Sequence, residues 1–235
     1  MNAVFKREFK SFFTSPVGYV VIAAITFFAG LFFYILNIVG LSPDLSYVFS
    51  SLFPFILIIL PLMTMRLFSE EKRQKTDQAL LTSPVSLTGI VMGKFLAAML
   101  VFSISLLLLI VFAMIIAFQV TPDWLVIIGN YLGMFLLGGL VISIGLLISS
   151  LTESQLIAAI GTLGISFMLI LMDGLAAQFS NLTILSSVIN FLSVSQRYST
   201  FTSGIIAYDN IIFFLSMQAL FLFLTVRVLD RKRWS

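Results

Sequence analysis

Six long apolar segments make up most of this 235-residue chain, and short charged or polar stretches separate them. The segments cover residues 17–40, 45–65, 95–120, 125–148, 155–172 and 211–226. A helix needs roughly 20 mainly apolar residues to cross a bilayer. Soluble domains contain about a quarter charged residues, whereas this chain is 60% hydrophobic and only 10% charged. We therefore predict an all-α, polytopic membrane protein with six transmembrane helices.

The basic residues are divided unevenly between the two sets of connections. Of the 13 lysines and arginines, only Arg197 falls on the side opposite to the two chain ends. Four acids fall on the side of Arg197, namely Asp44, Asp123, Asp173 and Asp209. Because short loops rich in Lys and Arg stay in the cytoplasm, this pattern predicts that both chain ends are cytoplasmic. The net charge of +3 then reflects orientation in a lipid bilayer, and no nucleic-acid partner is expected.

The first 16 residues contain an aromatic row at helical spacing. The row is Phe5, Phe9, Phe12 and Phe13, spaced i, i+4, i+7, i+8. Lys6, Arg7 and Lys10 fall on the opposite face, and Pro16 interrupts the chain before the first apolar segment. Amphipathic helices of this kind lie flat at a membrane surface, so residues 1–16 are predicted to form an interfacial helix. The alternative is a simple positively charged anchor.

The connection over residues 66–94 is the longest charged one. Its first part is rich in helix formers, and Glu71 and Lys75 have the i, i+4 spacing of a favourable ion pair. Leu80 and Leu81 then form an apolar tip. A short charged helix with an apolar tip, held between two membrane helices, can receive force from a soluble partner. The alternative is a solvated loop, because charge composition alone does not separate the two.

The end of the same connection carries a break and a helix start. Pro84 disfavours helical geometry in the residue before it. Ser86 is placed to cap the helix that leads into the third apolar segment. Force received by the loop would therefore pass into the membrane helices on both sides of it.

This connection resembles the loop between spans two and three in the ABC-2 family of ATP-binding-cassette permeases. The family pattern is an acidic-basic run, a Thr-Leu-Glu-Leu-Leu-like stretch, a Pro-Val turn and a Gly-Lys pair. The matching residues are Glu70, Glu71, Lys72, Arg73, Thr76, Leu80, Leu81, Pro84, Val85, Gly93 and Lys94. Lys75 and Gln78 depart from the family's usual glycine and acid. In addition, residues 6–21 (KREFKSFFTSPVGYVV) are similar to the permease subunit of gliding-motility-associated ABC transporters.

The resemblance implies a type V exporter-like permease in the cytoplasmic (inner) membrane of a bacterium. Two six-span subunits, as a homodimer or a heterodimer, would form the pathway. Two cytoplasmic ABC ATPase subunits would bind ATP and Mg²⁺, so this chain itself is expected to bind no cofactor. The resemblance also allows a membrane partner with a periplasmic domain. The implied function is to couple ATP hydrolysis to substrate export or to mechanical work.

Individual residues receive roles from the same resemblance. Residues 76–84 would include the coupling helix that enters a cleft of the ATPase. ATPase coupling is thereby assigned to Glu70, Glu71, Lys72, Arg73, Thr76, Leu80, Leu81, Pro84 and Glu153. The interfacial helix would make further contacts there. Residues 174–210 would form an outer re-entrant loop, within a single transmembrane domain over residues 1–235.

Little in the sequence offers covalent chemistry. The chain contains no His and no Cys, so the commonest metal ligands and general base are missing. The stretch from Gly89 to Lys94 has too few residues between its glycines for a phosphate-binding Walker A loop. We expect no catalytic or metal site in this chain, and an energy source in another chain or in an ion gradient.

Two other functions remain compatible with the sequence. A secondary carrier would work without an ATPase, but ion coupling usually leaves charged residues inside the spans, and the six predicted spans carry none. A structural anchor would assemble with partners without forming a pathway.

Scattered polar, aromatic and small residues complete the pattern. The polar residues in or beside the spans are Asn37, Gln119, Asn130 and Gln218. Each could line a pathway, although a hydrogen bond to a neighbouring helix is the commoner role. Tyr47, Trp124, Tyr198 and Tyr208 are predicted at the outer membrane boundary. Gly129 and Gly133 permit close approach of another helix.

Overall fold

The computed structural model describes residues 1–76, 85–118, 120–178 and 193–233; for residues 170 and 172–178 it describes only the backbone. Within these ranges the chain forms helices and no strand. The elements are α1 (Asn2–Thr14), α2 (Val17–Phe33), the π-helix η1 (Tyr34–Val39), α3 (Ser46–Thr64), α4 (Ser69–Arg73), α6 (Leu87–Ala117), α7 (Trp124–Leu151), α8 (Gln155–Gln178), α10 (Val194–Thr202) and α11 (Tyr208–Arg233).

Five helical stretches are long and apolar enough to cross a membrane. They are Val17–Val39, Ser46–Arg73, Leu87–Ala117, Trp124–Leu151 and Tyr208–Arg233. The remaining predicted segment corresponds to α8, which is apolar over Gln155–Leu169. The all-α membrane fold expected from the sequence is therefore confirmed, with a helix at the position of each of the six predicted segments.

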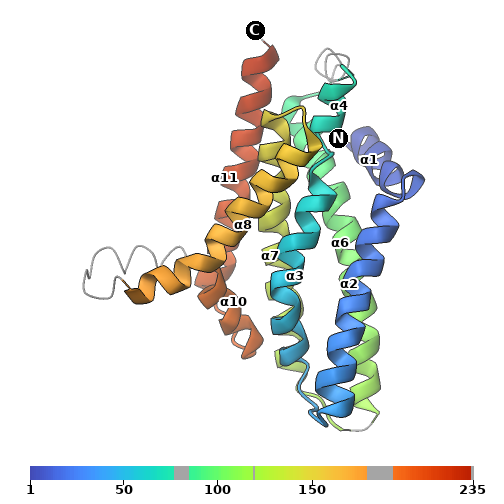
Figure 1. Cartoon of the computed structure of the whole chain (residues 1–235), viewed down its shortest axis with the longest axis vertical. Helices are drawn as coiled ribbons and strands as arrows, with labels where there is room; N and C mark the ends of the chain where they lie inside the picture. Colours follow the sequence, from blue (N-terminus) through green and yellow to red (C-terminus); the bar gives the residue numbers. More distant parts are fainter. Residues whose placement is uncertain (77–84, 119, 179–192, 234–235) are drawn as a thin grey trace.

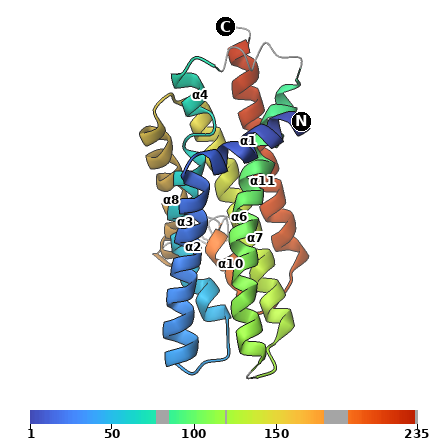
Figure 2. The ribbon, with the colours of Figure 1, turned by 90° about the vertical axis from the view of Figure 1, so that its right-hand side faces the viewer.

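Helix α7 lies at the centre of the bundle. It packs against α3, α6, α8, α10 and α11, and it is the most buried of the five spans. On the other side of the molecule, α2 packs against α3 and α6 and is the least buried span. Figures 1 and 2 show the long helices running side by side along the longest axis. Since the chain exposes many large apolar side chains on its outer helices, a lipid environment suits this surface.

Small residues of α7 receive the short helix α10. A Cβ atom placed on Gly133 would lie 2.7 Å from Cβ of Phe201, and one on Gly129 would lie 2.8 Å from the Phe201 carbonyl oxygen. Phe201 is fully buried against them. The close approach predicted for this glycine pair therefore occurs within one chain, and its partner is α10.

The two chain ends lie at the same end of the bundle. α1, α4 and the last turn of α11 gather there (Figure 1), and we call this the terminal end and the opposite one the distal end. α1 runs across the long helices instead of along them (Figure 2). A helix is thus present where residues 1–16 were predicted to form one; its location in a membrane interface stays a prediction.

The start of α6 agrees with the sequence analysis. α6 begins at Leu87, eight residues before the apolar segment, because the Oγ of Ser86 accepts a hydrogen bond from the Gly89 backbone N–H at 3.2 Å. The cap predicted at Ser86 is confirmed. Lys94 consequently lies inside a membrane-length helix, as its eighth residue, just before the predicted span over residues 95–120.

Candidate functional site

Helix α1 buries a row that differs from its aromatic row. Val4, Glu8 and Phe12 recur every four residues and are buried, and α1 packs on α6. Gly93 of α6 makes this packing close, since a Cβ atom there would lie 3.1 Å from Cβ of Val4. Phe9 lies beside this row and is half-buried. The helix therefore presents one carboxylate, that of Glu8, to the bundle.

The predicted aromatic residues form a stack beside that buried row. The rings of Phe5 and Phe9 lie 6.2 Å apart between centroids, and those of Phe9 and Phe13 lie 5.1 Å apart. Phe12 belongs to the buried row instead. The four phenylalanines thus occupy two adjacent rows of α1.

Lys94 lies in the second turn of α6 and is almost completely buried, with 1% of its side chain exposed. Its Nζ is 3.1 Å from Oε1 of Glu8 and 3.0 Å from Oε1 of Glu71. It also donates a hydrogen bond of 2.7 Å to the carbonyl oxygen of Leu67. That carbonyl is available because α3 ends at Thr64 and the chain turns before α4. One ammonium thus contacts α1, α4 and the turn between α3 and α4.

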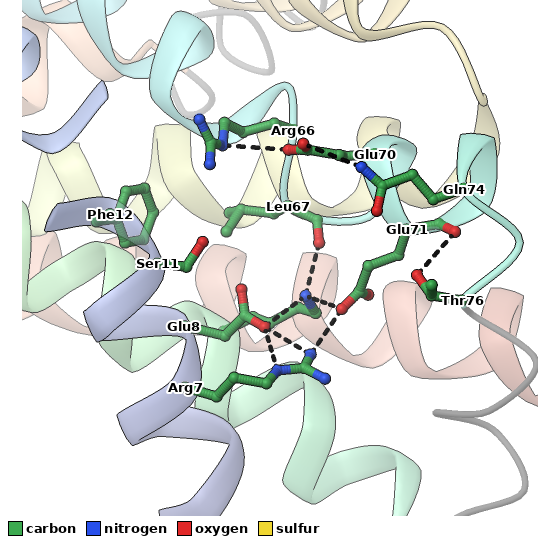
Figure 3. A pocket seen from close by; sticks show the side chains of 11 residues that line it. Arg7, Glu8, Ser11, Phe12, Arg66, Leu67, Glu70, Glu71, Gln74 and Thr76 are labelled. Atoms are coloured by element: carbon green, nitrogen blue, oxygen red, sulfur yellow. Dashed lines mark hydrogen bonds and ion pairs between the residues drawn. The ribbon is translucent and has the colours of Figure 1, made fainter. Parts of the chain in front are cut away.

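Arg7 closes the cluster from the other side. Its Nη2 lies 2.7 Å from Oε1 of Glu8 and 2.6 Å from Oε1 of Glu71. Figure 3 shows these three side chains pointing toward one another, although they come from α1 and α4. Burial by itself would lower the pKa of Arg7, but the hydrogen bonds and charges of Glu8 and Glu71 outweigh it and leave the pKa raised. The guanidinium therefore stays charged.

We call Arg7, Glu8, Glu71 and Lys94 the ionic cluster. It contains two cations and two anions, so its formal charge is balanced. A buried charge is costly unless it is paired and hydrogen-bonded, and removing one partner of such a pair costs about 3–5 kcal/mol. Oε2 of Glu71 is buried and has no hydrogen-bond partner among the described residues. The cluster therefore depends on each of its four members.

A pocket of about 330 Å³ opens beside the ionic cluster. Its lining residues are Arg7, Glu8, Ser11, Phe12, Arg66, Leu67, Glu70, Glu71, Gln74, Thr76 and Lys94 (Figure 3). Among the residues that the structure describes, no group of three or more metal-ligating side chains occurs. The charged side chains in the pocket pair with one another, and this arrangement serves to join helices.

A second polar junction lies at the same end of the bundle. The Nζ of Lys72 in α4 donates to the carbonyl oxygen of Ser150, and Lys232 of α11 donates to the same oxygen at 3.3 Å. Ser150 is in the last turn of α7, where carbonyl groups lack helical partners and attract cations. α4 is thereby connected to α1 and α6 on one side and to α7 and α11 on the other.

The predicted coupling residues are distributed as follows. Glu70 pairs with Arg66 at 3.4 Å, and the hydroxyl of Thr76 donates to the backbone carbonyl of Glu71 at 3.2 Å. Arg73 is exposed on α4, and Glu153 is exposed between α7 and α8. Glu71 belongs to the ionic cluster and Lys72 to the junction at Ser150. Leu80, Leu81 and Pro84 lie outside the described residues.

The ion pair predicted between Glu71 and Lys75 was wrong. α4 ends at Arg73, and Lys75 has a φ of 57°, outside helical geometry. In the described part of the chain, Glu71 pairs with Arg7 and Lys94 instead. The i, i+4 relation exists only while both residues belong to one helix.

Sequence reasoning missed Glu8 and Lys94 and assigned Arg7 to the solvated face of its helix. One signal could have found Glu8: it lies four residues from Val4 and from Phe12, an acid within an apolar row. Lys94 gave a weaker signal, because it was taken as the end of a loop. An acid and a base that each interrupt an apolar row are candidates for pairing.

Polar residues within the bundle mostly bond to neighbouring helices. Asn130 donates to the Ser46 hydroxyl of α3 at 3.3 Å and to the Thr202 carbonyl of α10 at 3.4 Å, and also to the Val126 carbonyl of its own helix at 2.8 Å. Gln218 donates to the Leu136 carbonyl at 2.9 Å. The role preferred for these residues in the sequence analysis is confirmed for this pair, while Gln119 lies outside the described residues.

At the distal end, α10 is fastened by its own polar groups. The hydroxyl of Tyr198 donates to the Phe49 carbonyl at 3.2 Å, and its ring stacks on Phe53 at 4.9 Å. Arg197 donates to Oδ1 of Asn210 at 2.7 Å. Tyr198 is buried within the chain; its place at the outer membrane boundary stays a prediction.

The comparison with protein families gives one finding. A family model described as "ABC-2 family transporter protein" matches residues 2–234 of this chain. No curated protein matches the chain.

Proposed function

The chain belongs to the ABC-2 family of transporter proteins, and we propose that it is the membrane-spanning permease subunit of an ABC transporter that couples ATP hydrolysis by a partner ATPase to substrate export or mechanical work. The family match and the five membrane-length helices support a transport role. ATP and Mg²⁺ would be bound by the ATPase and not by this chain.

The observation that carries the coupling proposal is the attachment of the predicted coupling segment. Before residues 77–84, Thr76 is bonded to Glu71 of α4. After them, α6 begins at Leu87 and bears Lys94. Glu71 and Lys94 meet in the ionic cluster, so a force on the segment reaches α4 and α6 at one joined point. The ATPase contact would be made by Thr76, Leu80, Leu81 and Pro84, with Glu70, Glu71, Lys72 and Arg73 orienting it.

The rest of the assembly follows from the same proposal. The terminal end would face the cytoplasm of a bacterium, with α1 at the inner surface of the cytoplasmic membrane and Glu153 as a further ATPase contact. A second permease, identical or different, would complete the pathway, and a membrane protein with a periplasmic domain would be an additional partner. The clustering of basic residues at the terminal end supports this orientation.

The decisive experiment changes the apolar tip. We expect Leu80→Asp with Leu81→Asp to abolish stimulation of the ATPase, because two charges cannot enter an apolar cleft without a large desolvation cost. Insertion of the helices should be unaffected. ATP hydrolysis by the purified complex, measured beside the membrane content of the variant, checks this.

Leu41→Asp is the matched control. Leu41 is 87% exposed at the distal end and has a φ of 51°, which aspartate tolerates. This variant should keep normal stimulation. Unchanged ATP-dependent activity in the Leu80/Leu81 variant would remove the assignment of the coupling contact to this segment.

A further inference from the structure

We propose that Lys94 is a positioning residue for coupling: its ammonium transmits movement of α4 to the α1–α6 pair. The inference rests on the proposed function, because it assumes that an ATPase acts on the segment between α4 and α6. It concerns a residue inside a membrane helix that touches neither ATP nor the predicted ATPase contact.

Each hydrogen of the Lys94 ammonium has its own acceptor. A lysine has three N–H donors and no acceptor. In this structure three acceptors surround Nζ: Glu8 at 3.1 Å, Glu71 at 3.0 Å and the Leu67 carbonyl at 2.7 Å. Each belongs to a different part of the chain, so the ammonium fixes three segments at once. The Phe68 ring, with its centroid 5.0 Å from Nζ, covers it further.

Arg7, the other cation of the ionic cluster, connects fewer helices than Lys94 does. Arg7 also contacts Glu8 and Glu71, so it holds α1 to α4. It belongs to α1, however, and makes no described contact with α6. Within the ionic cluster only Lys94 belongs to α6, and therefore only Lys94 connects α6 to the carboxylates of the other two helices.

α1 and α6 are held together by apolar packing. Val4 packs on Gly93, where even a Cβ atom would be only 3.1 Å away, and Phe12 is buried in the same row. This contact is tight and apolar. α4, in contrast, reaches α6 through the carboxylate of Glu71. Apolar packing makes α1 and α6 one body, and the ionic contact makes α4 the part attached to it.

The test separates this role from simple charge balance. Lys94→Met leaves one cation against two anions in a buried site, and it should lower both stability and coupling. Glu71→Gln with Lys94→Met restores equal numbers of charges, Arg7 with Glu8. We expect the double variant to recover most of the thermal stability lost in the single variant. Its stimulation of ATP hydrolysis should stay roughly 5- to 150-fold below that of the wild type, the usual range of coupling between sites.

Binding and coupling are measured separately in the same preparations. The ATPase should co-purify with the double variant, since Leu80, Leu81 and Pro84 are unchanged, while stimulation is lost. Lys10→Met, at an exposed position on α1, is the control for loss of a lysine and should behave as the wild type.

Three results would overturn the inference. Recovery of both stability and stimulation in the double variant would mean that Lys94 only balances charge. If both Lys94 variants fail to accumulate, Glu71→Ala decides, because it keeps Lys94 on Glu8 and Leu67 but detaches α4; normal stimulation in that variant would refute the role. A wild-type chain that stimulates no ATPase would instead refute the proposed function, and the inference with it.

Discussion

Glu8 and Lys94 each interrupt an apolar row, and each is stabilised there by the other at 3.1 Å and by a further ionic partner, Arg7 for Glu8 and Glu71 for Lys94. Neither charge would be favourable there alone, since desolvation of an unpaired ion costs several kcal/mol. A hydrophobic pair of similar size would often be equally stable or more so. The retention of charges at this point therefore agrees with a role in joining segments that move.

Tyr198 offers a test at a single buried hydroxyl. Tyr198→Phe keeps the ring stacked on Phe53 and removes only the hydrogen bond to the Phe49 carbonyl. We expect the free energy of unfolding to fall by about 0.5–1.5 kcal/mol. Thermal unfolding in detergent measures this, with Tyr208→Phe as the control because Tyr208 is 80% exposed.

The difference in stability between the wild type and Tyr198→Phe should depend on pH. Burial raises the pKa of the Tyr198 phenol above that of an exposed tyrosine. In the unfolded chain the phenol loses its proton near pH 10, so stability contributed by the buried, neutral phenol is lost as pH rises above that value. The difference between wild type and Tyr198→Phe should therefore shrink in alkaline solution. An equal or growing difference would contradict burial as the cause.

Sequence reasoning at the residue scale worked for local patterns and failed for distant ones. The cap at Ser86 was predictable because donor and acceptor lie three residues apart. The ion pair of Glu71 was not, because its partner Arg7 lies 64 positions away. Spacing within one helix cannot identify a partner at that distance. Lys75, four residues after Glu71, was therefore wrongly predicted to be its partner.

The helices α1 and α6 show which parts of a helix can be predicted from a run of apolar residues and which cannot. The apolar run begins at Phe95, but the helix begins at Leu87, since the Ser86 cap starts it about two turns earlier, before Gly93 and Lys94. Counting apolar residues identifies the part of a helix that contacts lipid or the core. It does not identify polar turns at the end of the same helix. For the same reason α1 was recognised as amphipathic although its buried row was misassigned.

The contact between α1 and α6 gives a prediction at this scale. Gly93→Val would push against Val4 and the Phe5 backbone, both within 3.2 Å of a Cβ atom at this site. Overpacking of this kind costs about 1–3 kcal/mol, so α1 should detach more often. Because the chain has no native cysteine, a single Phe12→Cys, at a buried position, reports detachment as faster maleimide labelling.

Gly164→Val in α8 is the matched control, because nothing lies within 4 Å of a Cβ atom there. It should leave the labelling rate of Phe12→Cys unchanged. Equal labelling rates in the Gly93 and Gly164 variants would show that α1 is not held by this contact, and the single α1–α6 body would have to be abandoned.

For the whole molecule, hydropathy predicted the number and kind of long segments but not their arrangement. All six are apolar on most sides, so their sequences do not reveal that α7 lies at the centre. That position depends on contacts between distant residues, such as Phe201 on Gly133. The uneven distribution of charge, in contrast, was readable from the sequence, and the basic chain ends do lie at one end of the bundle.

The measurement that tests the account most directly is purification of this chain from its native membrane in mild detergent, with identification of the proteins that accompany it. We predict a stoichiometric cytoplasmic protein with nucleotide-binding Walker motifs, present with the wild type and lost with Leu80→Asp/Leu81→Asp. A well-folded chain that repeatedly brings down no ATPase would contradict the permease account and favour a carrier driven by an ion gradient.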